Sequence, residues 1–387
     1  MIKRIFTVVL DSFGIGAMPD ADRYGDQGSD TLGALTKSAA LRAPNLLSMG
    51  LGAIEGSALS SSAQPRGAYG RLLERSAGKD TTTGHWELAG VVTERPFPTY
   101  PEGFPRPLID RLELALGVRL LCNRPYSGTQ VIRDYGSEHL ATGALICYTS
   151  ADSVLQLAAH EDLVPVETLY RYCKIAREVM TGDDAVGRII ARPFAGEAPD
   201  FYRTERRHDF SLKPPTTLLD LLQQAGKDVL SVGKIYDIFA GQGISQSFPT
   251  ANNAEGIATL SRLIDTPFEG LCFVNLVDFD MLYGHRNDVD GYAKAISDFD
   301  RALGDILPRL KDDDLMIVTA DHGCDPSTPS TDHSREYVPL LICGTPVRQG
   351  VNLGTRATFA DVAATVADCF DCPYPLAGTS FKQELLR

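Results

Sequence analysis

The fold is decided by an apolar run that ends in an acidic residue, Ile5-Phe6-Thr7-Val8-Val9-Leu10-Asp11. Two later runs follow the same pattern, since Leu271–Val277 leads to Asp280 and Leu315–Thr319 leads to Asp321. Continuous apolar runs of this length are typical of parallel strands buried on both faces. Open α/β sheets bind ligands beyond the carboxyl ends of their strands. We therefore expect one sheet edge to carry all three carboxylates.

Further apolar runs alternate with longer helical patterns along the rest of the chain. The predicted additional strands are Val229–Val232, Val338–Cys343, Ala144–Tyr148 and Arg188–Ala191. Alternating strands and helices are typical of α/β proteins. The sequence therefore predicts an α/β fold with a mainly parallel sheet flanked by helices.

Two proline-rich segments divide the chain. With 387 residues it is longer than a typical domain of about 100–200 residues, so two domains are expected. The prolines gather between Arg95 and Pro105 and again at Lys213-Pro214-Pro215. Proline interrupts helices and central strands, so such clusters mark linkers. We predict a core domain of residues 1–95 and 214–387, with an inserted α/β domain of residues 96–213.

Composition narrows the classes of function. Fifty acidic against 37 basic residues give a net charge of −13, which opposes general binding to a nucleic-acid backbone. No apolar run approaches the roughly 18–20 residues of a membrane span, and no secretory leader is recognisable. The eight cysteines are scattered, apart from Cys369 and Cys372. A cytoplasmic enzyme with no membrane contact and no obligate protein partner is expected.

Acidic and histidine residues near strand ends are candidate metal ligands. Asp321 and His322 begin a polar loop that ends at His333. Asp280 and His285 form a second pair. Gly284, just before the histidine, permits the chain to turn back, so that both side chains could point at one ion. Asp278 competes with Asp280 because both lie on the same face of the strand. Either carboxylate could instead cap a helix.

With Asp11, these candidates amount to three carboxylates and three imidazoles. Mixed Asp/His ligation suits Mn²⁺ or Zn²⁺ better than Ca²⁺ or Mg²⁺. Two ions about 3.5–4 Å apart would use all six ligands and could clamp a phosphoryl displacement. Two divalent ions would carry more positive charge than the three carboxylates carry negative charge. The excess would attract an anionic phosphate.

Three threonines precede a predicted helix at Thr81-Thr82-Thr83-Gly84-His85. The N–H groups at a helix start bind phosphate. A threonine hydroxyl on a metal is a workable nucleophile, whereas an N-cap role is the ordinary alternative. The residues alone do not choose among the three threonines.

The inserted segment is rich in residues that bind anions. Ser150 and Asp152 follow one apolar run, Arg188 and Arg192 bracket another, and a basic cluster spans Phe201–Asp209. Arginine forks suit bidentate phosphate contacts, although a solvated charge run would have the same composition. We predict an anion site in this segment.

Four stretches together resemble the phosphopentomutases, a metal-dependent family of the alkaline phosphatase superfamily that is related to cofactor-independent phosphoglycerate mutase. The stretches are Val9–Gly16, Lys79–Glu87, Asp278–Arg286 and Thr319–Pro326. The resemblance implies an alkaline-phosphatase-like core with an inserted α/β cap domain. It implies an isomerase that interconverts ribose 1-phosphate and ribose 5-phosphate, and the deoxyribose pair, in nucleoside catabolism and salvage. Small pentose phosphates would be the substrates.

The resemblance also implies cofactors: two Mn²⁺ ions, with glucose 1,6-bisphosphate or a similar sugar bisphosphate as activator. The intermediates would be a phosphothreonine and a pentose bisphosphate. In the related phosphoglycerate mutases, the nucleophile stands four residues before the histidine of a Gly-His pair. Applied to Gly84-His85 of this chain, the same spacing selects Thr81. The family pattern chooses Asp280 over Asp278. The implied metal ligands are Asp11, Asp280, His285, Asp321, His322 and His333. The implied sugar-phosphate positions are Ser150, Asp152, Arg188, Ile190, Arg203 and Lys234.

Three other activities share parts of this pattern. A metal-dependent phosphatase or sulfatase-like hydrolase would use the same core but release inorganic phosphate. A phosphoglycerate mutase would act on a substrate with a carboxylate. A non-catalytic sugar-phosphate binding protein would need no activated nucleophile, so the complete ligand set argues against it.

Overall fold

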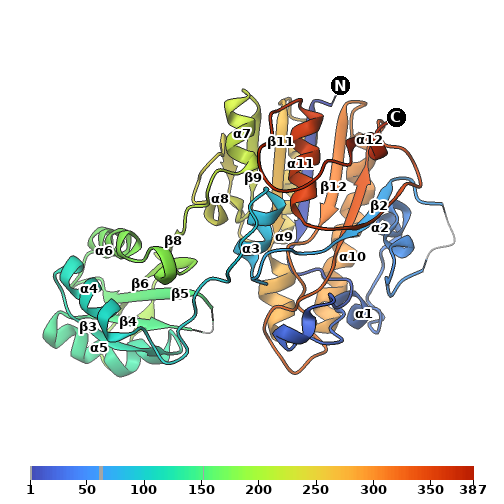
Figure 1. The fold of residues 1–387 in the computed structure, drawn as a ribbon. Coiled ribbons are helices and arrows are strands. Elements are labelled where there is room, and N and C mark those ends of the chain that lie inside the picture. Colours follow the sequence, from blue (N-terminus) through green and yellow to red (C-terminus); the bar gives the residue numbers. More distant parts are fainter. Residues whose placement is uncertain (1, 61–63, 151) are drawn as a thin grey trace. The chain divides into compact units, whose positions relative to one another are not determined.

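A computed structural model of the chain describes residues 2–60, 64–150 and 152–387. The chain divides into two compact units, one formed by Met1–Pro96 and Pro214–Arg387 and the other by Phe97–Lys213 (Figure 1). We call them the core unit and the inserted unit.

An eight-stranded sheet forms the centre of the core unit, in the order β10-β9-β11-β1-β12-β13-β2-β14. The strands are β1 (Arg4–Leu10), β2 (Ala68–Leu72), β9 (Asp228–Val232), β10 (Gln246–Phe248), β11 (Gly270–Leu276), β12 (Asp314–Thr319), β13 (Val338–Cys343) and β14 (Asn352–Arg356). The five strands from β10 to β12 are parallel, whereas β13 runs antiparallel to both of its neighbours. The mainly parallel sheet predicted from the apolar runs is confirmed.

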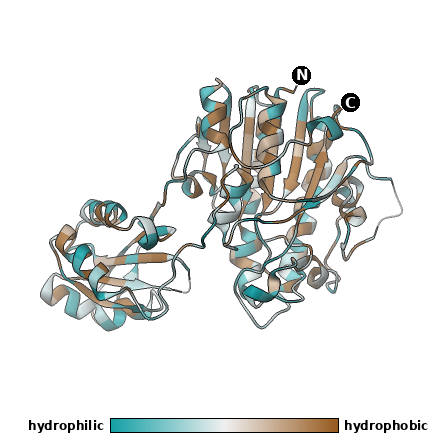
Figure 2. Cartoon of the chain, in the orientation of Figure 1, coloured by the Kyte–Doolittle hydropathy of each residue, from teal (hydrophilic) through white to brown (hydrophobic). Residues whose placement is uncertain are grey.

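Helices cover this sheet on both faces, since every residue of β1, β11 and β12 is buried. One group packs around α10, which contacts α1, α2 and α9, and a second packs around α11, which contacts α3 and α7. Figure 2 shows the apolar colouring concentrated in the strands between them. The helices of the core unit are α1 (Thr31–Leu35), α2 (Pro44–Met49), α3 (Thr81–Leu88), α7 (Leu218–Gln224), α8 (Ile235–Ile238), α9 (Asn253–Asp265), α10 (Val289–Ile306), α11 (Ala360–Cys369) and α12 (Lys382–Leu385).

The inserted unit has its own mixed sheet, in the order β3-β4-β5-β6-β7, with β8 also paired to β6. Its strands are β3 (Leu120–Pro125), β4 (Leu145–Thr149), β5 (Val154–His160), β6 (Arg188–Ala195), β7 (Tyr202–Arg203) and β8 (His208–Ser211), and its helices are α4 (Arg106–Leu116), α5 (Gln130–Thr142) and α6 (Val166–Val179). Helices α4 and α6 pack on one face of the sheet. Helix α5 packs on part of the other face, against Ile146, Tyr148 and Phe194.

Candidate metal centre and nucleophile

Three carboxylates lie at one edge of the core sheet because β11, β1 and β12 are adjacent and parallel. Asp11 directly follows β1, and Asp321 comes two residues after β12. Asp280 lies in the π-helical turn Phe279–Tyr283 that follows β11. All three side chains are buried, so the apolar strands bring together carboxylates from three distant parts of the sequence.

The histidines divide these carboxylates into two clusters. In the first, His322 Nε2 lies 3.4 Å from Asp11 Oδ1 and 3.3 Å from Asp321 Oδ2. In the second, Asp280 lies 3.1 Å from His285 Nε2 through Oδ2 and 3.5 Å from His333 Nε2 through Oδ1. The ring centroids of His322 and His333 are 4.1 Å apart, so the clusters adjoin. The first cluster has the spacing of a metal site, and so does Asp280 together with His322 and His333.

Backbone carbonyls orient two of the imidazoles. His322 Nδ1 is 3.0 Å from the carbonyl oxygen of Gly323, and His285 Nδ1 is 2.6 Å from that of Thr331. A ring that donates from Nδ1 to a carbonyl presents Nε2 as its free lone pair. Metal-binding histidines are commonly oriented in this way.

The pKa values of the cluster reflect burial and close packing of charge. Burial and the neighbouring charge of Asp321 raise the pKa of Asp11. Burial also acts to raise the pKa of Asp280, but His333 and His285 hold it well below its ordinary value. Burial acts to lower the pKa of His322, and Asp321 and Asp11 overcome that effect and raise it. The clusters therefore favour a bound positive charge.

Several ligand atoms are buried without satisfying their hydrogen-bonding capacity. Within the part of the chain that the structure describes, no hydrogen-bond partner exists for Asp11 Oδ1, Asp280 Oδ1, Asp321 Oδ2 or His333 Nε2. Buried polar atoms are rarely left unpaired, and each such atom costs about 1–3 kcal/mol. Four of them at one sheet edge, all on oxygen or imidazole nitrogen, fit a site for divalent cations.

Asp278, the alternative to Asp280, has a different role. Its Oδ2 accepts a hydrogen bond of 2.8 Å from the backbone N–H of Asn253, the first residue of α9. Asn253 Oδ1 in turn accepts one of 2.9 Å from the backbone N–H of Asp278. Asp278 therefore fixes the start of a helix, whereas Asp280 faces the histidines.

The three threonines are also distinguished. Asp80 is the N-cap of α3, and its carboxylate accepts hydrogen bonds from the backbone N–H and the hydroxyl of Thr83. Thr81 is the first residue of the helix, and its Oγ1 lies 3.2 Å from His322 Nε2. Thr81 is therefore the threonine that lies beside the predicted metal ligands.

Two buried residues support the site without having been assigned a role from the sequence. His85 Nδ1 lies 2.8 Å from the carbonyl oxygen of Thr81 and 3.1 Å from Asp321 Oδ2. Asn275 Nδ2 donates a hydrogen bond of 2.7 Å to Asp11 Oδ2. Sequence signals existed for both, because His85 shares a helix face with Thr81 and Asn275 is a polar residue inside an apolar strand.

Cys324 is a third residue that the sequence prediction did not assign as a ligand. Its sulfur has ligand spacing to Asp280 and His285. Burial raises the pKa of this thiol, and Sγ donates to the carbonyl oxygen of Asp332 at 3.5 Å. Cys324 therefore lies beside the second cluster, within ligand distance of Asp280 and His285.

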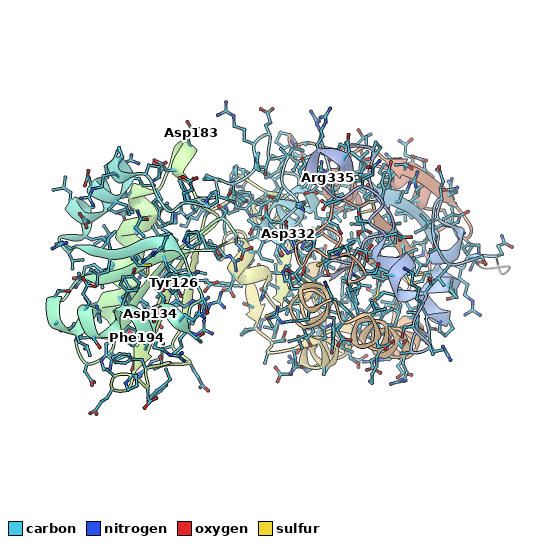
Figure 3. All side chains as sticks on the ribbon, turned by 90° about the horizontal axis from the view of Figure 1, so that it is seen from below. Tyr126, Asp134, Asp183, Phe194, Asp332 and Arg335 are labelled. Atoms are coloured by element: carbon cyan, nitrogen blue, oxygen red, sulfur yellow. The ribbon has the colours of Figure 1, made fainter. Side chains whose placement is uncertain are left out.

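Ion pairs attach the loop that carries His333 to the segment before α3. Lys79 Nζ lies 3.1 Å from Asp332 Oδ2, and Arg335 pairs with Glu74 at 2.7 Å. Figure 3 labels Asp332 and Arg335 among the side chains of the core unit. Arg335 also donates to the carbonyl oxygen of Gly78 at 2.7 Å. These contacts fix the loop that carries His333 relative to the segment before α3.

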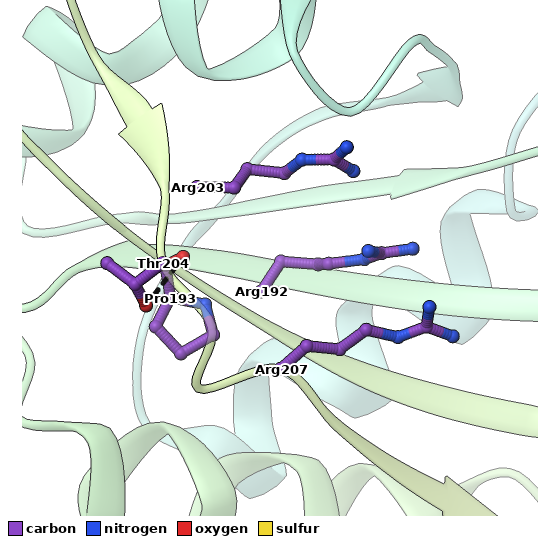
Figure 4. A pocket seen from close by; sticks show the side chains of 5 residues that line it. All are labelled: Arg192, Pro193, Arg203, Thr204 and Arg207. Atoms are coloured by element: carbon purple, nitrogen blue, oxygen red, sulfur yellow. Dashed lines mark hydrogen bonds between the residues drawn. The ribbon is translucent and has the colours of Figure 1, made fainter. Parts of the chain in front are cut away.

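The positions predicted to bind the sugar phosphate fall into both units. Arg188 and Ile190 lie on β6 and Arg203 on β7, while Ser150 follows β4. Asp152 lies 3.7 Å from Arg188. Figure 4 shows Arg203 beside a hollow of the inserted unit, whose lining residues are Arg192, Pro193, Arg203, Thr204 and Arg207. Lys234 belongs to the core unit, where it precedes α8.

Comparison with known proteins identifies the family of the chain. Residues 3–374 match the model of the metalloenzyme superfamily. A phosphopentomutase of Lachnoclostridium phytofermentans is 56% identical over 389 residues, which cover 100% of both chains. A phosphopentomutase of Caldanaerobacter subterraneus is 54% identical over 387 residues, covering 100% of this chain and 98% of the relative. The chain belongs to the phosphopentomutase family.

Membership of this family confirms the predicted class of enzyme and supports a metal cofactor. The alkaline-phosphatase-like core predicted from the sequence is confirmed as well. Murine ectonucleotide pyrophosphatase/phosphodiesterase 5 is similar in fold, with a TM-score of 0.50 at 11% identity over 100% of both chains. None of the described helices combines the length and hydropathy of a membrane span.

Proposed function

We propose that this phosphopentomutase-family enzyme interconverts ribose 1-phosphate and ribose 5-phosphate, and the corresponding deoxyribose phosphates, through a phosphorylated Thr81. The observation that carries the proposal is the position of Thr81 Oγ1, 3.2 Å from His322 Nε2. A hydroxyl placed at the first residue of a helix, among buried carboxylates and imidazoles, has the position of a phosphoryl acceptor. The names of the full-length relatives support the same reaction.

The two clusters would hold two divalent ions. One set would be Asp11, Asp321 and His322, which have the spacing of a metal site. The other would be Asp280 with His285 and His333, which lie 3.1 Å and 3.5 Å from its carboxylate oxygens. Mn²⁺ is the ion that such mixed ligands suit. When bound, divalent ions would activate the Thr81 hydroxyl and neutralise charge on the transferring phosphoryl group. The chain supplies −3 from its carboxylates, so an anionic phosphate remains attracted to the loaded site.

The transfer balances in two half-reactions. The phosphoryl group on Thr81 passes to the free C1 hydroxyl of ribose 5-phosphate, so the bond from phosphorus to Thr81 Oγ1 breaks and a bond to the C1 oxygen forms. The C1 hydroxyl loses its proton, and Thr81 regains one. The resulting bisphosphate then returns its C5 phosphoryl group to Thr81. The bond from phosphorus to the C5 oxygen breaks and a bond to Thr81 Oγ1 forms, while Thr81 loses its proton and the C5 oxygen gains one. Ribose 1-phosphate and the phosphorylated enzyme remain. A sugar bisphosphate such as glucose 1,6-bisphosphate would supply the first phosphoryl group.

The chain's own residues prepare Thr81 for this role. Asp80 fixes the start of α3, and His85 contacts the carbonyl oxygen of Thr81 from the next turn. Asn275 holds Asp11 from the neighbouring strand β11. We assign the binding of the sugar phosphate to Ser150, Asp152, Arg188, Ile190, Arg203 and Lys234.

An assay of both products tests the proposal. The purified chain is loaded with Mn²⁺ and a trace of glucose 1,6-bisphosphate, then given ribose 5-phosphate. Ribose 1-phosphate is expected as the main product. Mainly free phosphate would identify a phosphatase, and turnover of 3-phosphoglycerate instead would identify a phosphoglycerate mutase.

A further inference from the structure

The two carboxylates of the first cluster are each held on one side by a hydrogen bond from the surrounding fold. Asn275 Nδ2 donates to Asp11 Oδ2 at 2.7 Å. The backbone N–H of Ser12 donates to Asp321 Oδ1 at 3.1 Å. The other two oxygens, Asp11 Oδ1 and Asp321 Oδ2, face His322 Nε2 at 3.4 Å and 3.3 Å. Each carboxylate therefore has one oxygen fixed by an N–H donor and one turned toward the imidazole, as in ligands that are oriented before the ion binds.

The backbone of Ser12 has a conformation that residues other than glycine rarely adopt. Its φ is 68°, in the left-handed region. A serine stays in this region at a cost in free energy, and only where its surroundings fix it. Tyr292, which is fully buried on α10, is one such neighbour. Its hydroxyl donates to the carbonyl oxygen of Asp11 at 3.2 Å and lies 3.0 Å from Ser12 Oγ. Tyr292 therefore holds the turn from which the Ser12 N–H reaches Asp321.

Asp280, the carboxylate of the second cluster, lacks comparable support. Among the residues that the structure describes, neither of its oxygens accepts a hydrogen bond from a backbone or amide N–H, and its close polar neighbours are His285 and His333. It lies in the π-helical turn Phe279–Tyr283, a backbone form that is rare in proteins. The direction of the Asp280 carboxylate therefore depends on the same two histidines that would share its ion.

The two clusters also differ in charge and in exposure. The first has two carboxylates and one imidazole, whereas the second has one carboxylate and two imidazoles. Every member of the first cluster is at most 1% exposed, but the side chains of His285 and His333 are 28% and 11% exposed. Attraction between charges is stronger in a buried site and is less screened by salt. Charge and burial therefore both favour a divalent cation at the first cluster.

We propose that the first cluster binds its divalent ion more tightly than the second, and that Asn275 and Tyr292 are positioning residues for that tighter site. Asn275 fixes Asp11 directly, and Tyr292 fixes Asp321 through the turn at Ser12. That both clusters hold ions rests on the proposed function. The order of affinity rests instead on the hydrogen bonds, charge and burial of the two clusters.

A calorimetric titration of the full chain with Mn²⁺ tests the order of affinity, after EDTA has removed bound metal and has itself been removed. Two steps are expected, and the first should be about tenfold or more tighter than the second. Electron paramagnetic resonance gives an independent measurement. The first equivalent of Mn²⁺ should show isolated ions, and the second should convert them to a magnetically coupled pair, because ions about 3.5–4 Å apart interact.

Variants assign each step to a cluster. His285→Ala should abolish the weaker step and leave the tighter one. Asn275→Leu should weaken the tighter step about 10- to 100-fold, which is the usual effect of removing a group that orients a ligand. Tyr292→Phe removes only a hydroxyl and should weaken the tighter step about threefold to tenfold. In both positioning variants the weaker step should keep its affinity, whereas general damage to the fold would weaken both steps.

Matched controls remove polar groups of the same kind elsewhere in the core unit. Thr7→Val is the control for Asn275→Leu, because the Thr7 side chain is buried on β1 and its hydroxyl has no hydrogen-bond partner among the described residues. Tyr374→Phe is the control for Tyr292→Phe, because the Tyr374 hydroxyl donates to the carbonyl oxygen of Ala377. Both controls should show the two Mn²⁺ steps of the parent.

The proposal is wrong if the two steps have equal affinity, or if His285→Ala loses the tighter step. If only one ion binds measurably, His285→Ala should retain it, and its loss would count against the proposal in the same way. Asn275→Leu and Tyr292→Phe that both keep the parent's tighter step would remove the positioning roles. Tyr292→Phe keeps the buried ring and is expected to fold even if Asn275→Leu does not.

The proposed function fails by a different measurement. A parent that binds Mn²⁺ in two unequal steps but forms no ribose 1-phosphate would retain the order of affinity and lose the proposed reaction. A parent that forms ribose 1-phosphate but binds both ions equally would retain the reaction and lose the order of affinity.

Discussion

Thr81 Oγ1 lies 3.2 Å from His322 Nε2, although the two residues are 241 positions apart in the sequence. Thr81 begins α3, and His322 follows β12, so the contact depends on the packing of that helix against the carboxyl edge of the sheet. The hydroxyl is therefore held at the ligands by the fold and not by local sequence. Removing the Thr81 hydroxyl should therefore affect turnover alone, whereas displacing α3 should also affect stability and metal binding.

Replacing Thr81 with alanine should lower ribose 1-phosphate formation by about 10³-fold or more, because no other group in the pattern would carry the phosphoryl group. Binding of Mn²⁺, measured by calorimetry, should persist, since the six carboxylate and imidazole ligands are unchanged. Thr82→Ala, one residue along the same helix, is the control and should keep its activity. Undiminished turnover in Thr81→Ala would remove Thr81 as the nucleophile.

The approach of α3 to the site can be tested at Gly84. A Cβ added there would lie 2.0 Å from the carbonyl oxygen of Asp321, which real atoms cannot occupy. Glycine to alanine inside a helix ordinarily stabilises a protein by about 1 kcal/mol. Here the added methyl group must push the helix away from the ligand segment. Gly84→Ala should therefore destabilise the chain by about 1–3 kcal/mol and weaken Mn²⁺ binding.

Urea unfolding and calorimetry with Mn²⁺ check both effects of Gly84→Ala. A variant that is more stable than the parent and binds Mn²⁺ equally well would show that the helix does not need this close approach.

The apolar runs made much of the core predictable. Strands β1, β11 and β12 read as continuous apolar segments because they are buried on both faces, and the parallel arrangement then places Asp11, Asp280 and Asp321 at one edge. The same logic could not separate Asp278 from Asp280, because both follow the same strand. In the structure, the first residue of α9 pairs with Asp278, whereas Asp280 lies beside His285 and His333.

Contacts between segments that are distant in the sequence could not be predicted from the sequence pattern. The repeat of three threonines gave no reason to prefer Thr81 on physical grounds, since the choice depends on how α3 meets His322. Tyr292 looked like an ordinary helix residue, and its contacts with Ser12 and Asp11 become visible only when α10 and the end of β1 are placed together. Such features depend on tertiary packing and leave no periodic signal.

Glu336 should give the stability of the chain a distinctive pH dependence. It accepts hydrogen bonds from the backbone N–H groups of Gly16 and Thr31 and from the hydroxyls of Thr31 and Ser334. Burial raises the pKa of Glu336 to about 7 against these four donors. An acid whose pKa is raised by folding contributes stability that is greatest below its unfolded pKa of about 4.3 and is lost as the pH rises through the folded value.

The expected loss of unfolding free energy between pH 4 and pH 8 from this one group is roughly 3 kcal/mol. Glu336→Gln cannot ionise and should lack that component. Urea unfolding of the parent and the variant across this range isolates the contribution of Glu336, because all other titrating groups are common to both. Parallel pH profiles for the two proteins would show that Glu336 does not titrate in this range.

The buried ion pair of Arg4 and Asp314 should be costly to break on one side. Arg4 donates to both oxygens of Asp314, at 2.8 Å and 2.5 Å, and both side chains are buried between β1 and β12. Arg4→Met leaves the Asp314 carboxylate buried and without its counter-charge, which should cost about 3–5 kcal/mol. The double variant Arg4→Met/Asp314→Leu removes both charges and should recover much of that loss. The adjacent pair Lys3 and Asp313 is largely exposed, so Lys3→Met should leave the urea midpoint unchanged. If Arg4→Met proves as stable as the double variant, the Asp314 carboxylate left without Arg4 carries no penalty, and the prediction is wrong.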